Sequence, residues 1–475
     1  MLRRTKIVAT LGPASSDHKT LKRMVAAGLD VVRMNLSHGP AADHVARAAL
    51  VREIAAKTGR PLGILFDLQG PKIRIGRFKN NKIMLHVGDQ FILDAECKLG
   101  DEKCVGLDYR KLPEDVARGD TLLLDDGRIV MGVTAVRGPR IFCVVEQGGV
   151  LSNNKGINRK GGGLSAPALT DKDMRDIELA ARLKADYLAV SFPRSGADIR
   201  RARELMLKAG GSSMIVAKIE RAEAIPALEE IIVASDAIMV ARGDLAVEVG
   251  DAAVPALQKR MIRMGREHNK VVITATQMME SMITNPIPTR AEVSDVANAV
   301  LDGTDAVMLS AETATGSYPV ETVAAMARVC IEAEKEEIFL SERRGLHAPQ
   351  GVEEAIARAT VFTANNLEIK AVAALTQSGK TALLMSRSNT RVPIYALSSV
   401  PETQRRVTLF RGVYPVNFKS ARDPERALLR AEDELLKRGA VGKGDYIVLT
   451  IGEPIGKAGG TNTMKIVRVG DYRSR

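Results

Sequence analysis

The sequence predicts an α/β protein built on a (β/α)8 TIM barrel, with an inserted small all-β barrel lid domain and a C-terminal α/β domain with a mostly parallel sheet. Three observations predict this. Eight short apolar runs alternate with amphipathic helical segments, a stretch of different pattern interrupts them, and a second alternating region follows. At roughly 150 residues per domain, the 475 residues suffice for three such units.

The eight apolar runs are the expected barrel strands. Their Val, Ile, Ala and Met content is nearly continuous, which is typical of strands buried on both faces and favours a parallel sheet. Ser16 is expected to cap the first helix, Gly28 to end it, and Thr289 with Glu292 to form a capping box. The strands are Lys6–Leu11, Val31–Leu36, Leu62–Asp67, Asp186–Phe192, Met214–Ile219, Asp236–Ala241, Val271–Ala275 and Asp305–Leu309.

The interrupting stretch reads as a β domain hinged over the barrel mouth, because its short alternating runs are broken by Gly-Asp, Asp-Gly and Gly-Pro turns. A linker is expected at residues 345–351, before the second alternating region. The lid runs are Lys82–Val87, Thr121–Leu124, Arg128–Val136 and Ile141–Val145, and the C-terminal runs are Ala371–Leu375, Pro393–Leu397, Val413–Asn417, Tyr446–Thr450 and Lys465–Val469. The expected domains are residues 1–70 with 167–344 (barrel), 71–166 (lid) and 345–475 (C-terminal domain).

Composition narrows the class of partner. The net charge is +12, from 69 Lys and Arg against 57 Asp and Glu, but no block of five or six basic residues suggests a nucleic-acid arm. Aromatic residues make up only 3% of the chain, which argues against a base-stacking surface. No window approaches 18 consecutive apolar residues, so no membrane partner is expected. Four cysteines without CxxC spacing favour the reducing cytoplasm.

Polar residues at the ends of the predicted strands indicate chemistry, since barrel active sites lie at the carboxyl ends of the strands. Lys218 and Glu220 share one face at a strand's period of two, and Asp244 follows the next strand. Two carboxylates suit a Mg²⁺ ion, and a lysine beside them suits charge developing on a phosphoryl group. A structural Lys–Glu pair in the barrel wall is the alternative.

A second polar cluster follows the second and third strands. Arg33, Asn35 and Ser37 share a face and Asp67 ends the next strand, a set that fits an anionic ligand or a monovalent cation. A polar network with only structural duties is the alternative. Thr276 follows the seventh strand and is expected to face the barrel mouth.

The C-terminal domain carries a candidate phosphate loop between a strand and a helix. The Walker pattern does not fit, because Ala374 stands where it needs glycine. A tight strand–helix connection is the alternative reading. The loop residues are Thr376, Gln377, Ser378, Gly379, Lys380 and Thr381.

Ordered motifs from residue 5 to about 470 closely resemble those of the pyruvate kinase family. The resemblance implies transfer of the phosphoryl group of phosphoenolpyruvate to ADP, giving pyruvate and ATP, the final step of glycolysis. It also implies a homotetramer whose C-terminal loop binds a sugar-phosphate or nucleotide effector. The motifs are residues 5–13, 33–39, 67–74, 217–220, 241–245, 274–282, 288–295, 307–313 and 461–464.

The resemblance also implies roles for individual residues. Glu220 and Asp244 would hold Mg²⁺ or Mn²⁺, and Lys218 would stabilise the phosphoryl group in flight. Arg33, Lys218, Gly243, Asp244 and Thr276 would contact phosphoenolpyruvate, with Thr276 near the carbon that is protonated. The nucleotide contacts would be Asn35, Leu36, Ser37, His38, Arg74 and Lys155, the last from a lid that closes to exclude water.

The chain departs from the family pattern in two places. Potassium-dependent members hold K⁺ with the equivalents of Asn35, Ser37, Asp67 and the Leu68 carbonyl, and they carry Glu where Lys72 stands here. We therefore predict activity without K⁺, with the ammonium group replacing the ion. The run Gly161–Gly163 replaces Leu-Pro-Gly of many members and is expected to alter lid hinging.

Two other functions are alternatives to phosphoryl transfer. A Schiff-base aldolase would use Lys218 as nucleophile, but Glu220 beside it would keep the amine charged. A non-catalytic phosphate-sensing scaffold would be indicated by loss of Lys218, Glu220 or Thr276, and all three are present.

Overall fold

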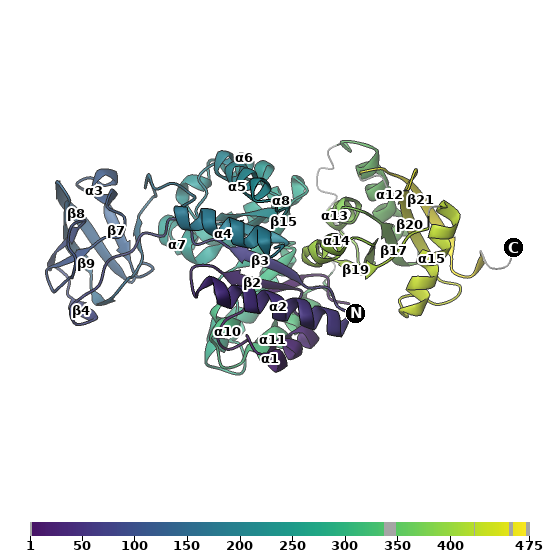
Figure 1. The fold of residues 1–475 in the computed structure, drawn as a ribbon, viewed down its shortest axis with the longest axis horizontal. Helices are drawn as coiled ribbons and strands as arrows, with labels where there is room; N and C mark the ends of the chain where they lie inside the picture. The colour runs from purple at the N-terminus through teal and green to yellow at the C-terminus, as the bar shows by residue number, and fades with distance from the viewer. Residues whose placement is uncertain (1, 337–347, 422, 456–458, 472–475) are drawn as a thin grey trace.

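The structure is a computed structural model that describes residues 2–336, 348–421, 423–455 and 459–471. A barrel occupies the centre, a β domain stands at one side and an α/β domain at the other (Figure 1). The expected barrel end at residue 344 and the first part of the expected linker, residues 345–347, lie outside the described residues. The exact domain limits therefore stay predictions.

Eight parallel strands of the described chain close into the barrel in the order β1-β16-β15-β14-β13-β12-β3-β2. The predicted strands are confirmed to within two residues at each end, because burial on both faces gives each an apolar run. The bounds are β1 Lys6–Thr10, β2 Val31–Asn35, β3 Gly63–Asp67, β12 Tyr187–Val190, β13 Met214–Ile219, β14 Ala237–Ala241, β15 Val271–Ala275 and β16 Ala306–Leu309.

Helices surround the barrel, and their caps test the sequence interpretation. The capping box of Thr289 and Glu292 is confirmed, while the cap at Ser16 is wrong. Asp17 accepts the Thr20 N–H at 2.9 Å, and the Ser16 hydroxyl donates instead to the Gly12 carbonyl at 2.6 Å. The helices are α1 His18–Ala27, α2 Ala41–Thr58, α4 Asp171–Arg182, α5 Gly196–Lys208, α6 Leu228–Ala234, α7 Arg242–Val249, α8 Val254–Glu267, α9 Arg290–Leu301, α10 Ala311–Ala314 and α11 Pro319–Ala333.

The inserted β domain between β3 and α4 is confirmed, but its ladders do not close into one circle. They form a six-stranded sheet in the order β11-β7-β8-β9-β5-β6 and a separate two-stranded sheet of β10 and β4. Isolated bridges such as Arg74–Gly156 and Ile75–Leu107 span the remaining gaps. The elements are β4 Lys82–Leu85, β5 Gln90–Asp94, β6 Cys104–Gly106, α3 Leu112–Asp115, β7 Thr121–Leu124, β8 Ile129–Arg137, β9 Arg140–Gln147, β10 Gly149–Ser152 and β11 Ile157–Arg159.

The C-terminal domain has a five-stranded sheet in the order β19-β18-β17-β20-β21. All neighbouring pairs are parallel except β20 with β21, which confirms the mostly parallel sheet. The elements are α12 Val352–Asn366, β17 Ile369–Leu375, α13 Lys380–Arg387, β18 Ile394–Ser398, α14 Pro401–Arg406, β19 Val413–Asn417, α15 Pro424–Lys437, β20 Tyr446–Gly452 and β21 Thr461–Arg468.

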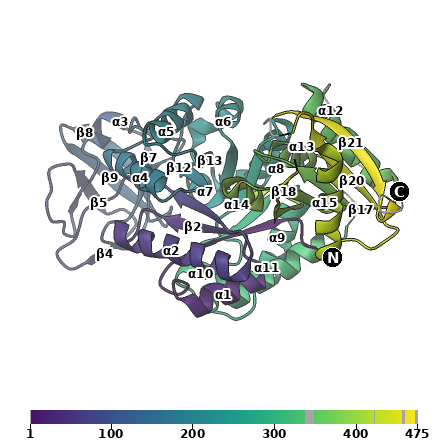
Figure 2. The same cartoon turned by 45° about the vertical axis from the view of Figure 1, so that its right-hand side comes forward.

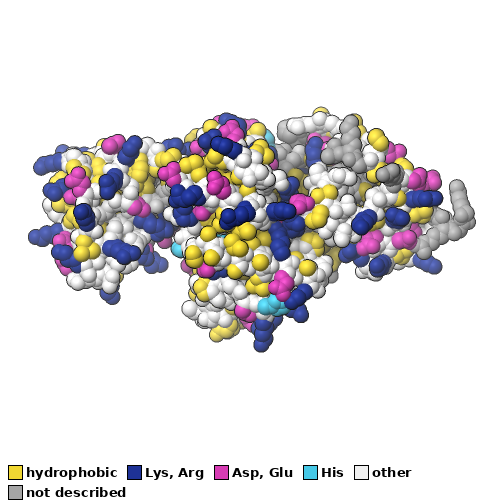
Figure 3. Space-filling view, viewed as in Figure 1, with side chains coloured by type: hydrophobic (Ala, Val, Ile, Leu, Met, Phe, Trp, Pro, Cys, Tyr) yellow, Lys and Arg dark blue, Asp and Glu magenta, His cyan; other side chains and the backbone are white. Residues whose placement is uncertain are grey.

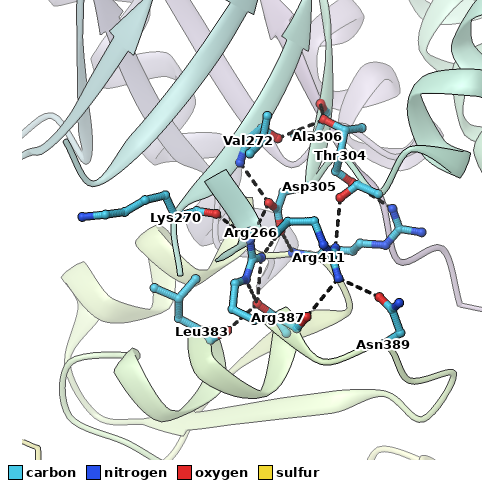
Figure 4. Close-up of polar contacts among 12 residues, drawn as sticks. Arg266, Lys270, Val272, Thr304, Asp305, Ala306, Leu383, Arg387, Asn389 and Arg411 are labelled. Carbon is cyan, nitrogen blue, oxygen red and sulfur yellow. Dashed lines mark hydrogen bonds and ion pairs between the residues drawn. The ribbon is translucent and has the colours of Figure 1, made fainter. Parts of the chain in front are cut away.

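The lid and the C-terminal domain contact opposite ends of the barrel, and both views place them on opposite sides (Figures 1 and 2). The lid reaches the carboxyl ends of the strands, where Lys72 pairs with Asp244 at 3.1 Å. The C-terminal domain contacts the amino ends of the strands, where Arg387 of α13 forms an ion pair with Asp305, just before β16 (Figure 4). The carboxyl ends of the strands are therefore left for a site between barrel and lid.

Candidate active site

Lys218 lies at the centre of a polar cluster at the carboxyl ends of the strands. Its ammonium Nζ is 3.2 Å from Glu220 Oε2 and 3.4 Å from Asp67 Oδ1, and it donates to Ser191 Oγ at 2.7 Å. The side chain is only 12% exposed. Burial alone would lower the pKa of Lys218, but the carboxylates of Asp67 and Glu220 raise it. The group is therefore held as a cation.

Arg33 and Asp67 form a buried ion pair beside it. Arg33 Nε and Nη2 lie 2.8 Å and 2.6 Å from Asp67 Oδ2, and Arg33 Nη1 donates to Thr10 Oγ1 at 3.0 Å. Burial would raise the pKa of Asp67, but Lys218 and Arg33 hold it below its usual range. The pairing brings β1, β2, β3 and β13 to one charged centre.

The two carboxylate oxygens of Glu220 have different partners. Its Oε1 accepts the Phe192 N–H at 2.9 Å, whereas its buried Oε2 has only the ion pair with Lys218 Nζ, at 3.2 Å. Burial raises the pKa of Glu220 to about 7, with Asp244 and Asp67 adding to the shift and Lys218 opposing it. A buried carboxylate oxygen with no other polar partner can also bind a metal cation.

Asp244 supplies the second carboxylate from the first turn of α7. Its Oδ1 accepts from Lys72 Nζ at 3.1 Å, and Lys72 also lies 3.9 Å from Asp126 of the lid. No group of three or more His, Cys, Asp or Glu side chains in the described residues forms a metal site. Two carboxylates on neighbouring strand ends fit a Mg²⁺ ion that takes its other ligands from water and substrate.

Thr276 follows β15 in a left-handed backbone conformation. Its φ is +75° and that of Gln277 is +55°. Arg242 holds this turn, since its Nη2 donates to the Thr276 carbonyl at 2.7 Å while its Nη1 lies 2.6 Å from Asp295. A Cβ on Gly243 would lie 2.7 Å from Thr276 Cγ2, so the two predicted substrate contacts pack directly together.

The expected nucleotide contacts fall into two groups. Asn35 belongs to the barrel, and its Oδ1 accepts the Ser37 N–H at 3.1 Å. Arg74 and Lys155 lie on adjoining lid segments, where Arg74 donates to the Asn154 carbonyl at 3.0 Å and Lys155 Nζ is 2.7 Å from Asp125. Burial and then the charge of Arg74 lower the pKa of His38.

The residues expected around K⁺ already have internal partners. Asp67 is engaged by Arg33 and Lys218, and the Leu68 carbonyl accepts the Ser191 hydroxyl at 2.7 Å. Lys72 contacts Asp244 instead of the Asn35–Ser37 segment. The Lys72 ammonium therefore lies beside Asp244, a predicted ligand of the divalent metal.

The C-terminal loop lines a pocket that is open to solvent. Gly379 has φ +83° and its N–H is bound by Thr376 Oγ1 at 2.9 Å, and Lys380 Nζ pairs with Glu353 at 2.8 Å. Thr381 also contacts Glu353 at 3.2 Å. The expected loop thus borders a cavity, with an acidic residue beside its lysine.

Sequence reasoning overlooked Ser191 and Arg242. Ser191 lies within the predicted run Asp186–Phe192, and its position at the carboxyl end of a barrel strand was the available signal. Arg242 stands between Ala241 and Gly243, and no local pattern links it to Thr276 or Asp295.

Comparisons with known proteins agree along the chain. The family model "Pyruvate kinase, barrel domain" matches residues 2–323, and "Pyruvate kinase, alpha/beta domain" matches residues 354–467. The chain is 55% identical to pyruvate kinase II of Salmonella typhimurium over 98% of this chain and 99% of the relative. It is 54% identical to a Haemophilus influenzae pyruvate kinase, over 95% of this chain and 96% of that one. The crystal structure of a Cryptosporidium parvum pyruvate kinase superposes with a TM-score of 0.92 at 34% identity, covering 98% and 96% of the two chains.

Proposed function

Because the chain belongs to the pyruvate kinase family and transfers the phosphoryl group of phosphoenolpyruvate to ADP, we propose that the cluster around Lys218 carries this reaction. The supporting observation is that Asp67 and Glu220 both pair with Lys218 at the carboxyl ends of the barrel strands, where Arg33 pairs with Asp67. Phosphoryl transfer needs positioning and charge neutralisation more than covalent work by the protein. The side chains of Lys218 and Arg33 beside the carboxylate of Glu220 supply both the positioning and the charge neutralisation.

Phosphoenolpyruvate binds, in this proposal, between Arg33, Lys218 and the turn of Gly243 and Thr276. The charged ammonium of Lys218 neutralises the phosphoryl group as it moves between the two oxygens, and Arg33 offers a planar fork to an anionic oxygen. Thr276 lies at the side where the enolate carbon receives its proton. The fixed turn held by Arg242 keeps that side chain in place.

Glu220 and Asp244 hold Mg²⁺, or Mn²⁺, in this proposal. The buried Glu220 Oε2 supports it, since its one polar partner is the Lys218 ammonium and it accepts no N–H or O–H in a well-formed hydrogen bond. The ion supplies charge neutralisation at the phosphoryl oxygens. Lys72, now paired with Asp244, keeps a positive charge at the site beside the metal ligands.

We propose that K⁺ is not required. The Lys72 ammonium supplies a fixed charge near Asp244, and the Asp67 and Leu68 oxygens that would face K⁺ already have partners. A monovalent ion would have to displace these contacts, whereas the lysine charge is built in.

ADP binds, in this proposal, between residues 35–38 of the barrel and Arg74 and Lys155 of the lid. The charge of Arg74 contributes to the lowered pKa of His38, which supports a nucleotide site that both parts share. Closure of the lid then excludes water, which would otherwise accept the phosphoryl group.

Regulation, assembly and location are further parts of the proposal. The pocket beside Thr376–Thr381 is the proposed site for a sugar-phosphate or nucleotide effector. A homotetramer is the proposed assembly. Figure 3 shows Lys and Arg side chains scattered over all three domains, which supports small-molecule rather than nucleic-acid partners. Within the described residues no helix has the length and apolarity that crossing a membrane demands. The four cysteines are unpaired, which supports a reducing cytoplasm.

The test is a coupled assay of ADP plus phosphoenolpyruvate on the wild type and on Lys218→Met. We expect that variant to bind Mg²⁺ yet lose at least about 100-fold in kcat, since one charge aimed at a transition state is worth that much. Lys208→Met, at an exposed surface of α5, is the matched control and should keep wild-type turnover. Near-normal kcat in Lys218→Met would contradict the proposal.

The aldolase alternative makes a different demand on Lys218. A Schiff base needs an uncharged amine, but Asp67 and Glu220 raise the pKa of Lys218 against the effect of burial. Treatment with pyruvate and borohydride should leave the lysine unmodified, whereas a covalent adduct would favour the aldolase.

A further inference from the structure

Ser191 contacts the ammonium group of Lys218 and has no role in the function described so far. It follows β12 directly and is 1% exposed. Lys218 Nζ donates to its Oγ at 2.7 Å, and that hydroxyl donates to the Leu68 carbonyl at 2.7 Å, with Asp67 Oδ1 further away at 3.4 Å. Because the single hydroxyl proton points to an acceptor, a lone pair faces the ammonium.

The other partners of Lys218 differ from Ser191 in charge. Asp67 and Glu220 are carboxylates, and Asp67 also binds Arg33. If Glu220 binds the divalent cation, as the proposed function requires, its oxygen is no longer available to hold the lysine. Ser191 then remains as a neutral contact that positions the ammonium without cancelling its charge.

A single turn holds both Ser191 and Glu220. The residue after Ser191, Phe192, has φ +56°, and its N–H donates to Glu220 Oε1 at 2.9 Å. A Cβ on Gly70 would lie 2.8 Å from the Ser191 Cβ, so the backbone packs closely against the serine. The hydroxyl therefore has little freedom to move away from Lys218.

We propose that Ser191 is a positioning residue for phosphoryl transfer, whose hydroxyl fixes the ammonium of Lys218 while leaving its charge free for the phosphoryl group. This rests on the proposed role of Lys218. Carboxylates alone would draw the ammonium toward the barrel wall, and a small displacement of a group aimed at the transition state costs rate more than binding.

The test compares substitutions at Ser191 in the coupled assay. Ser191→Ala should lower kcat about tenfold, in line with loss of a hydrogen bond to a charged group, and change KM for phosphoenolpyruvate less than about twofold. Ser191→Cys keeps nearly the same volume with a weak acceptor, so it should lose kcat as well. Recovery of wild-type kcat by the cysteine would show that packing, not the hydroxyl, matters, and would overturn the proposal.

Ser213→Ala is the matched control. Ser213 is also buried and its hydroxyl donates to the Ala185 carbonyl at 2.7 Å, but it lies at the opposite end of the barrel, before β13. It should retain wild-type kcat. A control that loses as much kcat as Ser191→Ala would overturn the positioning role, because any buried serine would then suffice.

A Lys218→Met background separates this inference from the proposed function. If Ser191 acts through Lys218, adding Ser191→Ala to Lys218→Met should cause no further loss of the residual rate. A further tenfold loss would overturn the inference while leaving Lys218 essential. Wild-type turnover in Lys218→Met alone would instead refute the role of the lysine itself.

Discussion

A buried ion pair between Arg387 and Asp305 is one of the contacts that join the barrel to the C-terminal domain, and Arg387→Met should destabilise this junction strongly. Asp305 is fully buried, and Arg387 Nη1 donates to its Oδ2 at 2.9 Å while Nη2 contacts Oδ1 (Figure 4). The N–H groups of Val272 and Arg411 add donors at 2.9 Å and 3.3 Å. Without Arg387 the two backbone N–H groups still donate to Asp305, but the guanidinium charge that pairs with its carboxylate is lost.

The structure sets the expected magnitude. Removing one partner of a buried pair costs about 3–5 kcal/mol, because the remaining charge stays away from water. The pair of Arg438 with Glu434 is the control, as its 2.7 Å contact lies on α15 and its C-cap with side chains 43% and 23% exposed. Arg438→Met should cost only about 0.3–0.5 kcal/mol.

Urea unfolding, followed with hydrogen exchange of the C-terminal domain, measures the difference. The double variant Arg387→Met with Asp305→Asn should recover part of the loss, since the unpaired buried charge is gone. Equal losses in Arg387→Met and Arg438→Met would refute the reasoning. So would a double variant less stable than Arg387→Met alone.

Three further predictions concern ligands. Burial raises the pKa of Glu220 to about 7, and a metal ion must displace the proton of this carboxyl group. Mg²⁺ should therefore bind about tenfold more weakly at pH 6 than at pH 8 in calorimetric titrations. Equal affinities at the two pH values would contradict this. The wild type should turn over equally in Na⁺ and K⁺, whereas Lys72→Glu should need K⁺; a large fall for the wild type in Na⁺ would refute the lysine's role. Lys380→Ala should weaken the thermal shift caused by fructose bisphosphate, and an unchanged shift would exclude the loop as its phosphate site.

The sequence predicted the barrel well because its signals are local. A strand buried on both faces needs apolar residues throughout, and a strand's period of two puts Lys218 and Glu220 on one face. Helix caps were harder where candidates adjoin. Ser16 and Asp17 both suit a cap, and only the side-chain geometry, with Asp17 bound to the Thr20 N–H, decides between them.

Contacts between distant segments could not be predicted in this way. Lys72 and Asp244 are 172 positions apart, and their pairing depends on where the lid meets the barrel. The lid itself closes its gaps with isolated bridges such as Arg74–Gly156, which leave no alternating pattern in the sequence. Ser191 was hidden for another reason, since a single hydroxyl in an apolar run does not show which lysine it meets.

The strand β12 combines a local sequence signal with contacts to distant segments. Its apolar run was predictable, but polar contacts with distant residues hold the positions just before and just after it. Asp186, just before it, accepts from Arg405 of the C-terminal domain at 2.8 Å and from the Ile64 N–H at 2.9 Å. Ser191, just after it, binds Lys218. Every residue between them is fully buried, and a close-packed strand cannot shift without disturbing its neighbours. The position of the Ser191 hydroxyl is therefore set by the whole sheet. The positions of Lys72 and Lys155 depend instead on the lid, and the segment that leads from the lid back to the barrel contains three successive glycines of positive φ, Gly161 to Gly163.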